Sequence, residues 1–408
     1  MIRKYYFAAA LSLLTLVGTA GCSDDDTPAI TKPDTEDKVN STDPDKIGYD
    51  DGEKLIFNVK IIIDREALVE KNGDMQWFKD NLKPQWEGIN ERFNALDKEN
   101  KLVREYEFRP DLEDILVFDP SECDQWGTVE YFVNKGKLDP EKFHCAVTYN
   151  FVAQEGDGGG GMGGWKGIGN VVVVHPNNIN EFVDHLTDPS KNGITSIVHE
   201  LGHFRGNIDT YPIYLKAEDN PFNNGLTLTP PYGNMNNPYG PTDDPKSLWN
   251  DYEVKVMNAT LAKKDEYLIH TTMRDYFADA IQINVKNKAD GTPVNESFTV
   301  RFYEIKNGKF VDKTTPLPKP IESRIKESKV NPLEIDAYEL FWTADKIKYP
   351  WSYYDLLMVE VETNSKAKGY ALIANYHVHN KGLEDKMNPD FNGRSIFTLN
   401  VDVEPQAE

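Results

Sequence analysis

Apolar positions divide the chain into two halves of different texture. In the first half, the run LIFNVKIIID at 55–64 is apolar and β-branched, which predicts a buried strand. Shorter strands are expected at about 102–108, 113–118, 143–152 and 171–174. An amphipathic helix packed on the sheet is predicted by six apolar residues at three- and four-residue steps: Phe78, Leu82, Trp86, Ile89, Phe93 and Leu96. This order of elements is typical of an α/β or α+β domain.

After residue 280 the pattern changes to short alternating runs without helical periods. Such runs predict strands and lie at 281–287, 297–305, 333–340, 356–363, 369–379 and 395–403. We therefore expect an α+β domain over 54–280 and an all-β, immunoglobulin-like sandwich over 281–408. His377 and His379 would alternate on one strand and share a polar face of the sheet.

The first residues have the composition of an export signal. Arg3 and Lys4 precede an apolar run at 5–17 that is too short to span a membrane, and small residues lead to Cys22. This arrangement resembles the lipobox of bacterial lipoproteins, with residues 1–21 as the signal peptide and Cys22 as the acylated residue. The alternative is an ordinary signal peptide followed by a chance cysteine.

Acidic residues follow Cys22. The sequence SDDD at 23–26 resembles the surface-export signal of lipoproteins in the Bacteroides group, although a solvated acidic spacer has the same composition. Residues 22–53 are rich in Asp, Thr, Lys and Pro, which predicts a disordered tether. The resemblance implies an outer-membrane lipoprotein, exposed on the cell surface and bound to the membrane only through the lipid on Cys22.

The whole chain is acidic, with 45 Lys and Arg against 67 Asp and Glu and a formal net charge of −22 over 408 residues. Phosphate binding needs a basic face, so this charge argues against nucleic acid as a partner. Besides Cys22, the chain contains Cys123 and Cys145. An extracytoplasmic location permits a disulfide between them, and two free, buried cysteines are the alternative.

The candidate chemistry lies in one predicted helix, ITSIVHELGHF at 194–204. His199 and His203 are four residues apart and project from the same side of a helix, where two imidazoles can bind one Zn²⁺. Glu200 lies beside them and could take a proton from water held at the metal. The alternative is a helix with two unrelated histidines and a surface glutamate.

The residues after this helix extend the motif. Gly206 can end the helix in the left-handed conformation, and such a turn would bring Asp209 back toward the metal as a third ligand. The fourth position would stay open for water, as in a catalytic zinc site. The pattern HELGHFRGNID resembles the metzincin metallopeptidases, in their HExxHxxGxxD variant.

The metzincin resemblance also implies a methionine in a tight turn beneath the zinc. Met235 in YGNMNNPYG at 232–240 fits that place, although a loop methionine is often simple core filling. Some members place a tyrosine two residues after this methionine. Here that residue is Asn237, and Tyr239 is the candidate transition-state donor. A helix is expected next, capped at Thr242 and continuing to about residue 259.

The glycine-rich segment GDGGGGMGGWKGIG at 156–169 lacks the Gly-Lys-Ser/Thr of a phosphate-binding loop and precedes a strand, so we do not interpret it as a nucleotide site. In metzincins the strand before the active-site helix pairs with extended substrate. Four residues fit that edge: Gly169, Asn170, Val171 and Val172. The glycines would then form a mobile loop above it, or a plain surface loop.

These observations predict a zinc-dependent endopeptidase that hydrolyses extracellular proteins or peptides, with one Zn²⁺ held by His199, His203 and Asp209, and Glu200 as general base. A second hypothesis is a catalytically inert adhesin or glycan-binding lipoprotein with a protease-like domain. A third keeps the peptidase but replaces Asp209 as the last ligand by Glu253.

Overall fold

The computed structural model describes residues 49–50, 52–95, 101–151, 159–174, 192–236, 249–261, 268–311, 317–341 and 356–405, and these all belong to one compact unit. The signal segment, Cys22, Tyr239 and the expected helix start at Thr242 lie outside the described residues. Within them, no helix is both long and apolar enough to cross a membrane.

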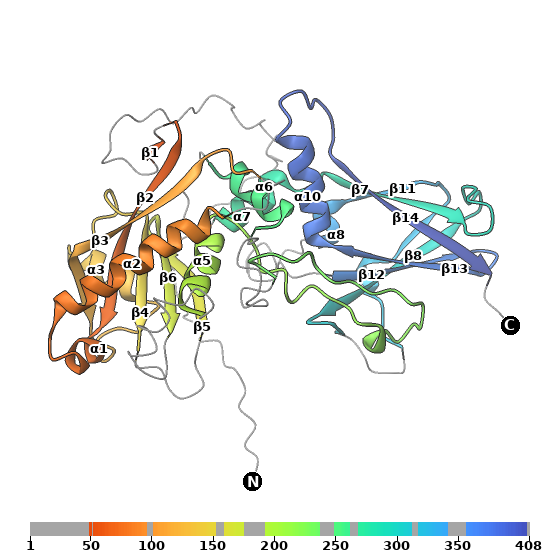
Figure 1. The fold of residues 1–408 in the computed structure, drawn as a ribbon. Helices are drawn as coiled ribbons and strands as arrows, with labels where there is room; N and C mark the ends of the chain where they lie inside the picture. The colour runs from red at the N-terminus through yellow and green to blue at the C-terminus, as the bar shows by residue number, and fades with distance from the viewer. Residues whose placement is uncertain are drawn as a thin grey trace, which may run out of the picture. The chain divides into compact units, whose positions relative to one another are not determined.

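The first sheet contains six strands of the described chain (Figure 1). Its members are β1 (Tyr49–Asp50), β2 (Lys54–Asp64), β3 (Glu105–Phe118), β4 (Cys145–Asn150), β5 (Gly159–Trp165) and β6 (Ile168–Val174). The strand order is β1-β2-β4-β6-β5, with β3 also paired to β2. Strands β2, β3, β4 and β6 are parallel, whereas β5 runs antiparallel to β6 and ends this order of strands.

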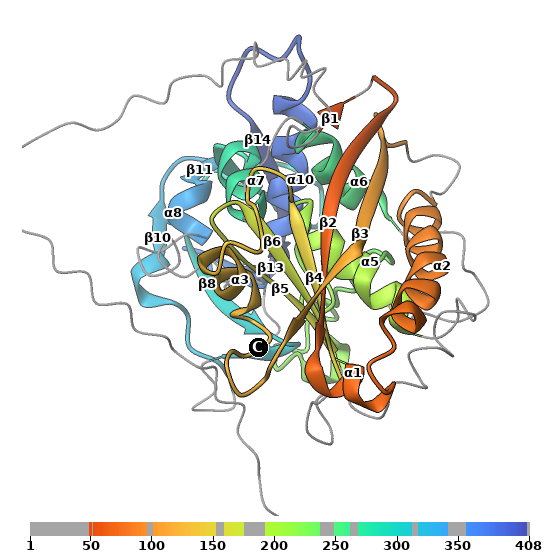
Figure 2. The same cartoon turned by 90° about the vertical axis from the view of Figure 1, so that its left-hand side faces the viewer.

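Helices cover both faces of this sheet (Figure 2). Their bounds are α1 (Arg65–Glu70), α2 (Met75–Phe93), α3 (Thr128–Asn134) and α5 (Asn192–Phe204). Helices α2 and α5 lie on one face and α3 on the other. The predicted amphipathic helix is confirmed, because Phe78, Leu82, Trp86, Ile89 and Phe93 of α2 are all buried in the core beneath it.

The expectation of two strands at 102–108 and 113–118 is wrong, because both belong to β3. The pairing of β3 with β2 shifts between Lys60 and Ile62, so the extra residues bulge out of the ladder. The Lys60 ammonium, on a side chain that is 2% exposed, binds the carboxylates of Asp111 and Asp114 at 2.8 and 2.7 Å. The polar bulge interrupts the apolar alternation, which explains why the sequence predicts a gap.

The second sheet contains eight described strands, in the order β10-β8-β12-β13-β14-β7-β11 with β9 paired to β8. Its members are β7 (Ala280–Asn287), β8 (Phe298–Lys306), β9 (Lys309–Phe310), β10 (Lys326–Ser328), β11 (Leu333–Asp336), β12 (Leu356–Thr363), β13 (Ala367–Ala374) and β14 (Ile396–Pro405). Strands β13 and β14 pair only at Ala367–Lys368 with Glu404–Pro405, whereas β14 pairs along eight residues with β7. The sheet therefore divides into two parts joined at one corner.

The expectation of an all-β C-terminal region is wrong at two places. The run at 369–379 changes from strand to helix at Asn375, where α10 (Asn375–Lys386) begins. The run at 333–340 likewise passes into a short helix, α8 (Ala337–Phe341). His377 and His379 consequently lie on a helix and do not share a face of the sheet.

Two further helices, α6 (Asp251–Ala259) and α7 (Leu268–Tyr276), precede β7. The expected helix from Thr242 to about 259 is wrong as one element, because Asn250 caps α6 through the Glu253 amide and Trp249 lies before the helix. Tyr252 and Val256 of α6 and Phe277 after α7 belong to the same core as the C-terminal strands. The segment after α5 joins that core through Ile213 and Leu215. Contacts therefore cross the expected domain boundary at residue 280.

Cys123 and Cys145 are free thiols in the structure. Cys145 is buried in β4, and burial raises the pKa of its thiol to about 12. Of the two alternatives that the sequence left open, the structure contains unpaired cysteines.

Candidate metal centre

The C-terminal end of α5 is fixed by a glycine turn. Gly206 has φ +92°, in the left-handed region that glycine adopts without strain. The Gly206 amide donates to the His203 carbonyl, and the Asn207 amide donates to the Gly202 carbonyl. These two bonds form a Schellman motif. As predicted, the chain reverses here and returns toward the histidines.

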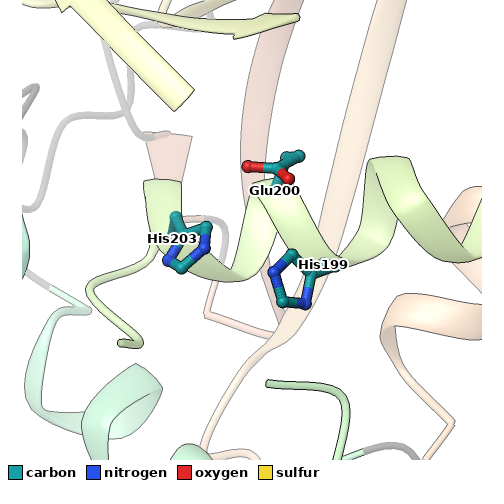
Figure 3. Close-up of side chains that lie close together, drawn as sticks. All are labelled: His199, Glu200 and His203. Atoms are coloured by element: carbon teal, nitrogen blue, oxygen red, sulfur yellow. The ribbon is translucent and has the colours of Figure 1, made fainter. Parts of the chain in front are cut away.

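The two histidines are oriented by carbonyl groups outside the helix. Nδ1 of His199 lies 2.9 Å from the Asn234 carbonyl oxygen, and Nδ1 of His203 lies 2.8 Å from that of Asn207. A carbonyl only accepts, so each Nδ1 carries a proton, and Nε2 is the nitrogen of each ring that can bind a metal once it is deprotonated. Figure 3 shows both rings and Glu200 close together on α5. The potential ligand atoms of these three residues lie within 4.8 Å of one another.

Asp209 reaches both histidines. Its Oδ1 lies 3.0 Å from His199 Nε2 and 3.3 Å from His203 Nε2. In a tetrahedral zinc site with bonds of 2.0–2.1 Å, neighbouring ligand atoms are about 3.3 Å apart. The carboxylate oxygen therefore lies at the separation of neighbouring zinc ligands from both imidazole nitrogens, and all three atoms are of donor types that bind zinc.

The charges of the centre are strongly coupled. Burial disfavours the imidazolium of His203, but the adjacent Asp209 carboxylate outweighs it and raises the pKa of His203 to about 9. For Asp209, burial raises the pKa. The two histidines outweigh this effect and hold the pKa of the carboxyl well below its usual range. The Asp209 carboxylate thus favours a positive charge between these groups. A proton on His203 supplies this charge, and a divalent metal ion can supply it instead.

Glu200 is held against the backbone of β5. Its side chain is 6% exposed, and Oε2 has no hydrogen-bond partner among the described residues. A Cβ added to Gly160 would lie 2.8 Å from Glu200 Oε1, so only glycine leaves room for the carboxylate at that point of β5. Burial raises the pKa of Glu200, and its two histidine neighbours oppose this shift. The carboxyl is therefore a proton acceptor of raised basicity.

The turn that contains Met235 packs beneath α5. The Asn236 amide donates to the Gly233 carbonyl, which closes the turn, and Thr210 next to Asp209 donates to the Met235 carbonyl. A Cβ on Gly202 would lie 2.9 Å from Met235 Sδ. The fully buried thioether thus lies against the glycine between the two histidines.

Glu253 supports this turn. Its Oε1 accepts from the Met235 amide at 2.9 Å and its Oε2 accepts from the Asn250 amide at 2.8 Å. A Cβ on Gly233 would come within 2.5 Å of the carboxylate. Burial raises the pKa of Glu253 to about 7, against the backbone donors. Both oxygens are used for the backbone, so Glu253 holds the turn that orients His199, and the structure does not place it as a metal ligand.

The expected substrate edge at Gly169–Val172 is wrong. These residues pair with β4 on one side and with β5 on the other, so their backbone groups are already used. The Asn170 side chain points to the α3 face, where its Nδ2 donates to the Gln125 carbonyl. The glycine segment expected as a loop contains the outer strand β5. Glycine has a low strand propensity, so no pattern of residues indicates this strand.

Other contributors to the site were not identified from the sequence. The carbonyls of Asn207 and Asn234 orient the histidines, and Gly160 makes room for Glu200. Backbone carbonyls have no sequence signature. The sequence could indicate them only indirectly, because two metal-binding histidines need a hydrogen-bond acceptor at each Nδ1.

Comparison with known proteins adds no functional information. No protein-family model and no curated protein matches the chain. A solved structure titled "Structure of a chaperone-substrate complex" aligns with 52% of this chain at 12% identity and a TM-score of 0.29. The chain spans 36% of that structure's chain, and a likeness at this TM-score carries no argument.

Proposed function

We propose that the protein is a zinc-dependent endopeptidase of metzincin type that hydrolyses extracellular proteins or peptides. The observation that carries this proposal is the approach of Asp209 Oδ1 to both Nε2 atoms, at 3.0 and 3.3 Å. Two imidazoles, which become neutral when a metal displaces the proton, and one carboxylate form a typical donor set of a catalytic zinc site, which leaves one position for the reactants.

The residues that would hold the ion are His199, His203 and Asp209. When bound, Zn²⁺ supplies Lewis-acid polarisation of a carbonyl and lowers the pKa of water. The carbonyls of Asn207 and Asn234 keep both rings in the tautomer that binds metal. Glu253 and Met235 support the turn from which one of these carbonyls projects.

Glu200 would carry the proton. Its raised pKa and buried Oε2 suit a general base that accepts a proton from the attacking water. The same carboxyl then donates this proton to the amine that leaves the scissile bond. Glu200 lies on the backbone of Gly160, a residue that is exposed, so the approach to the base is along β5.

Substrate would bind as an added strand on β5. In the described part of the chain β5 pairs with β6 alone, which leaves its other edge for an extended peptide. Cys22 would anchor the protein in the outer membrane through its lipid, with residues 22–53 as a tether to the surface.

The proposal is tested by Glu200→Ala and His203→Ala beside the wild type. Metal analysis of the wild type should give about one zinc per chain, retained in Glu200→Ala and lost in His203→Ala. Cleavage of a casein or gelatin panel should fall by about 10²–10⁴-fold or more in Glu200→Ala. Full activity of Glu200→Ala would end the proposal, and a wild type without zinc or cleavage would favour the inert adhesin.

A further inference from the structure

We propose that Trp126 forms an apolar subsite that selects an aromatic or large aliphatic side chain of the substrate, within about three residues of the scissile bond. The inference rests on the proposed peptidase function. It adds a substrate preference that neither the zinc motif nor the fold implies.

The indole of Trp126 lies directly on the glycines of β5. A Cβ on Gly161 would overlap Cη2 of the ring and come within 3.1 Å of Cζ3, and a Cβ on Gly163 would lie 3.8 Å from Cε3. The six-membered ring therefore rests on bare backbone. Any larger residue at position 161 would displace it, which gives this glycine a packing role.

The backbone of the tryptophan is held in place by polar contacts. Asn170 is 0% exposed, and its Nδ2 donates to the carbonyls of Gln125 and Trp126 at 3.1 and 3.4 Å. Asp124 Oδ1 accepts from the Trp126 amide at 2.9 Å and from the Gly127 amide at 2.9 Å. The loop that carries the ring is thus tied to β6 and to its own turn, which lowers the entropy lost when a ligand binds.

Despite this support, Trp126 is 50% exposed. One part of the ring contacts Gly161 and Gly163, and the remainder of the side chain is open to solvent. A large aromatic surface kept in a fixed position but left uncovered is typical of a binding contact. The occupant that the structure offers is the peptide strand proposed to pair with β5, because the ring lies on this same strand.

The position of the ring relative to the chemistry follows from the strand. Gly160 lies on Glu200, and Gly161 and Gly163 follow at one and three residues, which is about 3–10 Å along β5. Side chains of a paired peptide alternate between the two faces of the sheet in the same way as those of β5. Every second substrate residue therefore points to the face on which Trp126 lies.

Charge around the ring disfavours an acidic residue there. Glu122 and Asp119 of this loop are paired with Lys135 and Arg65 at 3.7 and 3.2 Å, whereas Asp124 directly adjoins Trp126. The Asp124 carboxylate would repel a substrate carboxylate, whereas an apolar side chain would cover the exposed indole. We therefore expect preference for Phe, Tyr, Leu or Met over Asp or Glu at that position.

The test compares wild type, Trp126→Ala and Trp126→Phe on matched peptides. First, cleavage sites in a protein digest by wild type should show enrichment of aromatic or large aliphatic residues at one position within three residues of the cut. Peptides with Phe or Asp at that position are then compared. In wild type kcat/KM should favour Phe by about tenfold, and Trp126→Ala should remove most of this preference. Trp126→Phe, which keeps a ring on the glycines, should retain part of it.

Val69→Ala, which shortens another exposed apolar side chain (68% exposed), is the matched surface control and should leave the preference unchanged. An equal loss on Phe and Asp peptides in Trp126→Ala would overturn the inference, because the ring would then only support β5. Cleavage without any apolar enrichment in wild type would also overturn it, even if the variants failed to fold. Absence of zinc-dependent cleavage in wild type would instead overturn the proposed function itself.

Discussion

Two buried histidines in different regions of this protein have opposite electrostatics. His203 in the metal centre has its pKa raised to about 9, whereas burial lowers the pKa of His379 on α10 to about 3. Both residues are at most 8% exposed. Burial opposes the charged form of both residues, so their neighbours decide the direction.

The neighbours of His379 use both ring nitrogens within the fold. Nδ1 lies 2.9 Å from the Tyr252 hydroxyl oxygen, and Nε2 lies 3.1 Å from the Thr272 carbonyl oxygen. His379 thereby joins α10 to α6 and α7. At His203, one nitrogen is held by a carbonyl and the other faces a carboxylate shared with His199. A candidate metal site is indicated where the ligand atoms of several side chains converge on one point. Burial alone does not indicate such a site.

The largest effect should come from removing the carboxylate that distinguishes the two histidine environments. Asp209→Ala should lower zinc affinity by more than about 100-fold, since even a residue that only orients a ligand costs about 10–100-fold. Peptidase activity should fall with it. Zinc titration and cleavage assays measure both quantities.

Glu360→Gln is the control in the C-terminal region, where the residue is 4% exposed and its carboxylate binds Arg301 at 2.9 Å. It should retain zinc and activity. Full zinc affinity in Asp209→Ala would contradict the assignment of the third ligand and reopen the question of Glu253.

A smaller effect is expected from a methyl group on β5. Gly160→Ala should push the Glu200 carboxylate from its place and lower kcat by roughly 10²-fold, because small misplacements of a catalytic group are costly. Zinc content should remain at the wild-type level. Steady-state kinetics with metal analysis separate the two quantities.

Gly163→Ala is the matched control on the same strand, since its Cβ would lie 3.8 Å from Trp126 and away from Glu200. Because Gly163 also contacts the proposed Trp126 subsite, KM is expected to change, but kcat should stay near the wild-type value. Equal kcat losses in the two variants would mean that alanine disturbs β5 as a whole, and the positioning role of Gly160 would be lost.

The smallest effect concerns the stability conferred by His379. Its pKa in the folded protein, about 3, lies below the ordinary 6.5 of the unfolded chain, so the unfolded state binds more protons between these values. This contribution is complete above pH 6.5 and is lost as the pH falls toward 3. The free energy of unfolding should therefore drop by about 1–2 kcal/mol from pH 7 to pH 5 through this residue.

Urea unfolding at pH 7, 6 and 5 tests this with His379→Gln beside wild type. As the pH falls, His379→Gln should show a smaller decrease in the free energy of unfolding than wild type. His377→Gln should keep the part of this decrease that is due to His379. An identical slope in His379→Gln and wild type would show that protonation elsewhere governs the acid response.

Much of the local structure was predictable. The strand at 54–64, the helix with Phe78 and Trp86, and the helix that carries HELGH each have a period confined to one element. Gly206 could be placed after the helix because a left-handed residue favours glycine. The strand expected to continue to His379 is wrong beyond Ala374. The alternation of apolar and polar residues continues there, but this segment packs on α6 and α7 as a helix.

By itself, the sequence determined which side chains can act together within one helix, because four-residue spacing places His199 and His203 on one side wherever α5 lies. It also limited the third ligand to a few acidic residues. Only the tertiary structure decided that Asp209 reaches both rings, that Glu253 holds a turn, and that the glycine strand β5 lies at the edge in place of β6. The reason is physical: helix geometry follows from local bonds, whereas strand neighbours and shared ligands depend on how distant segments pack.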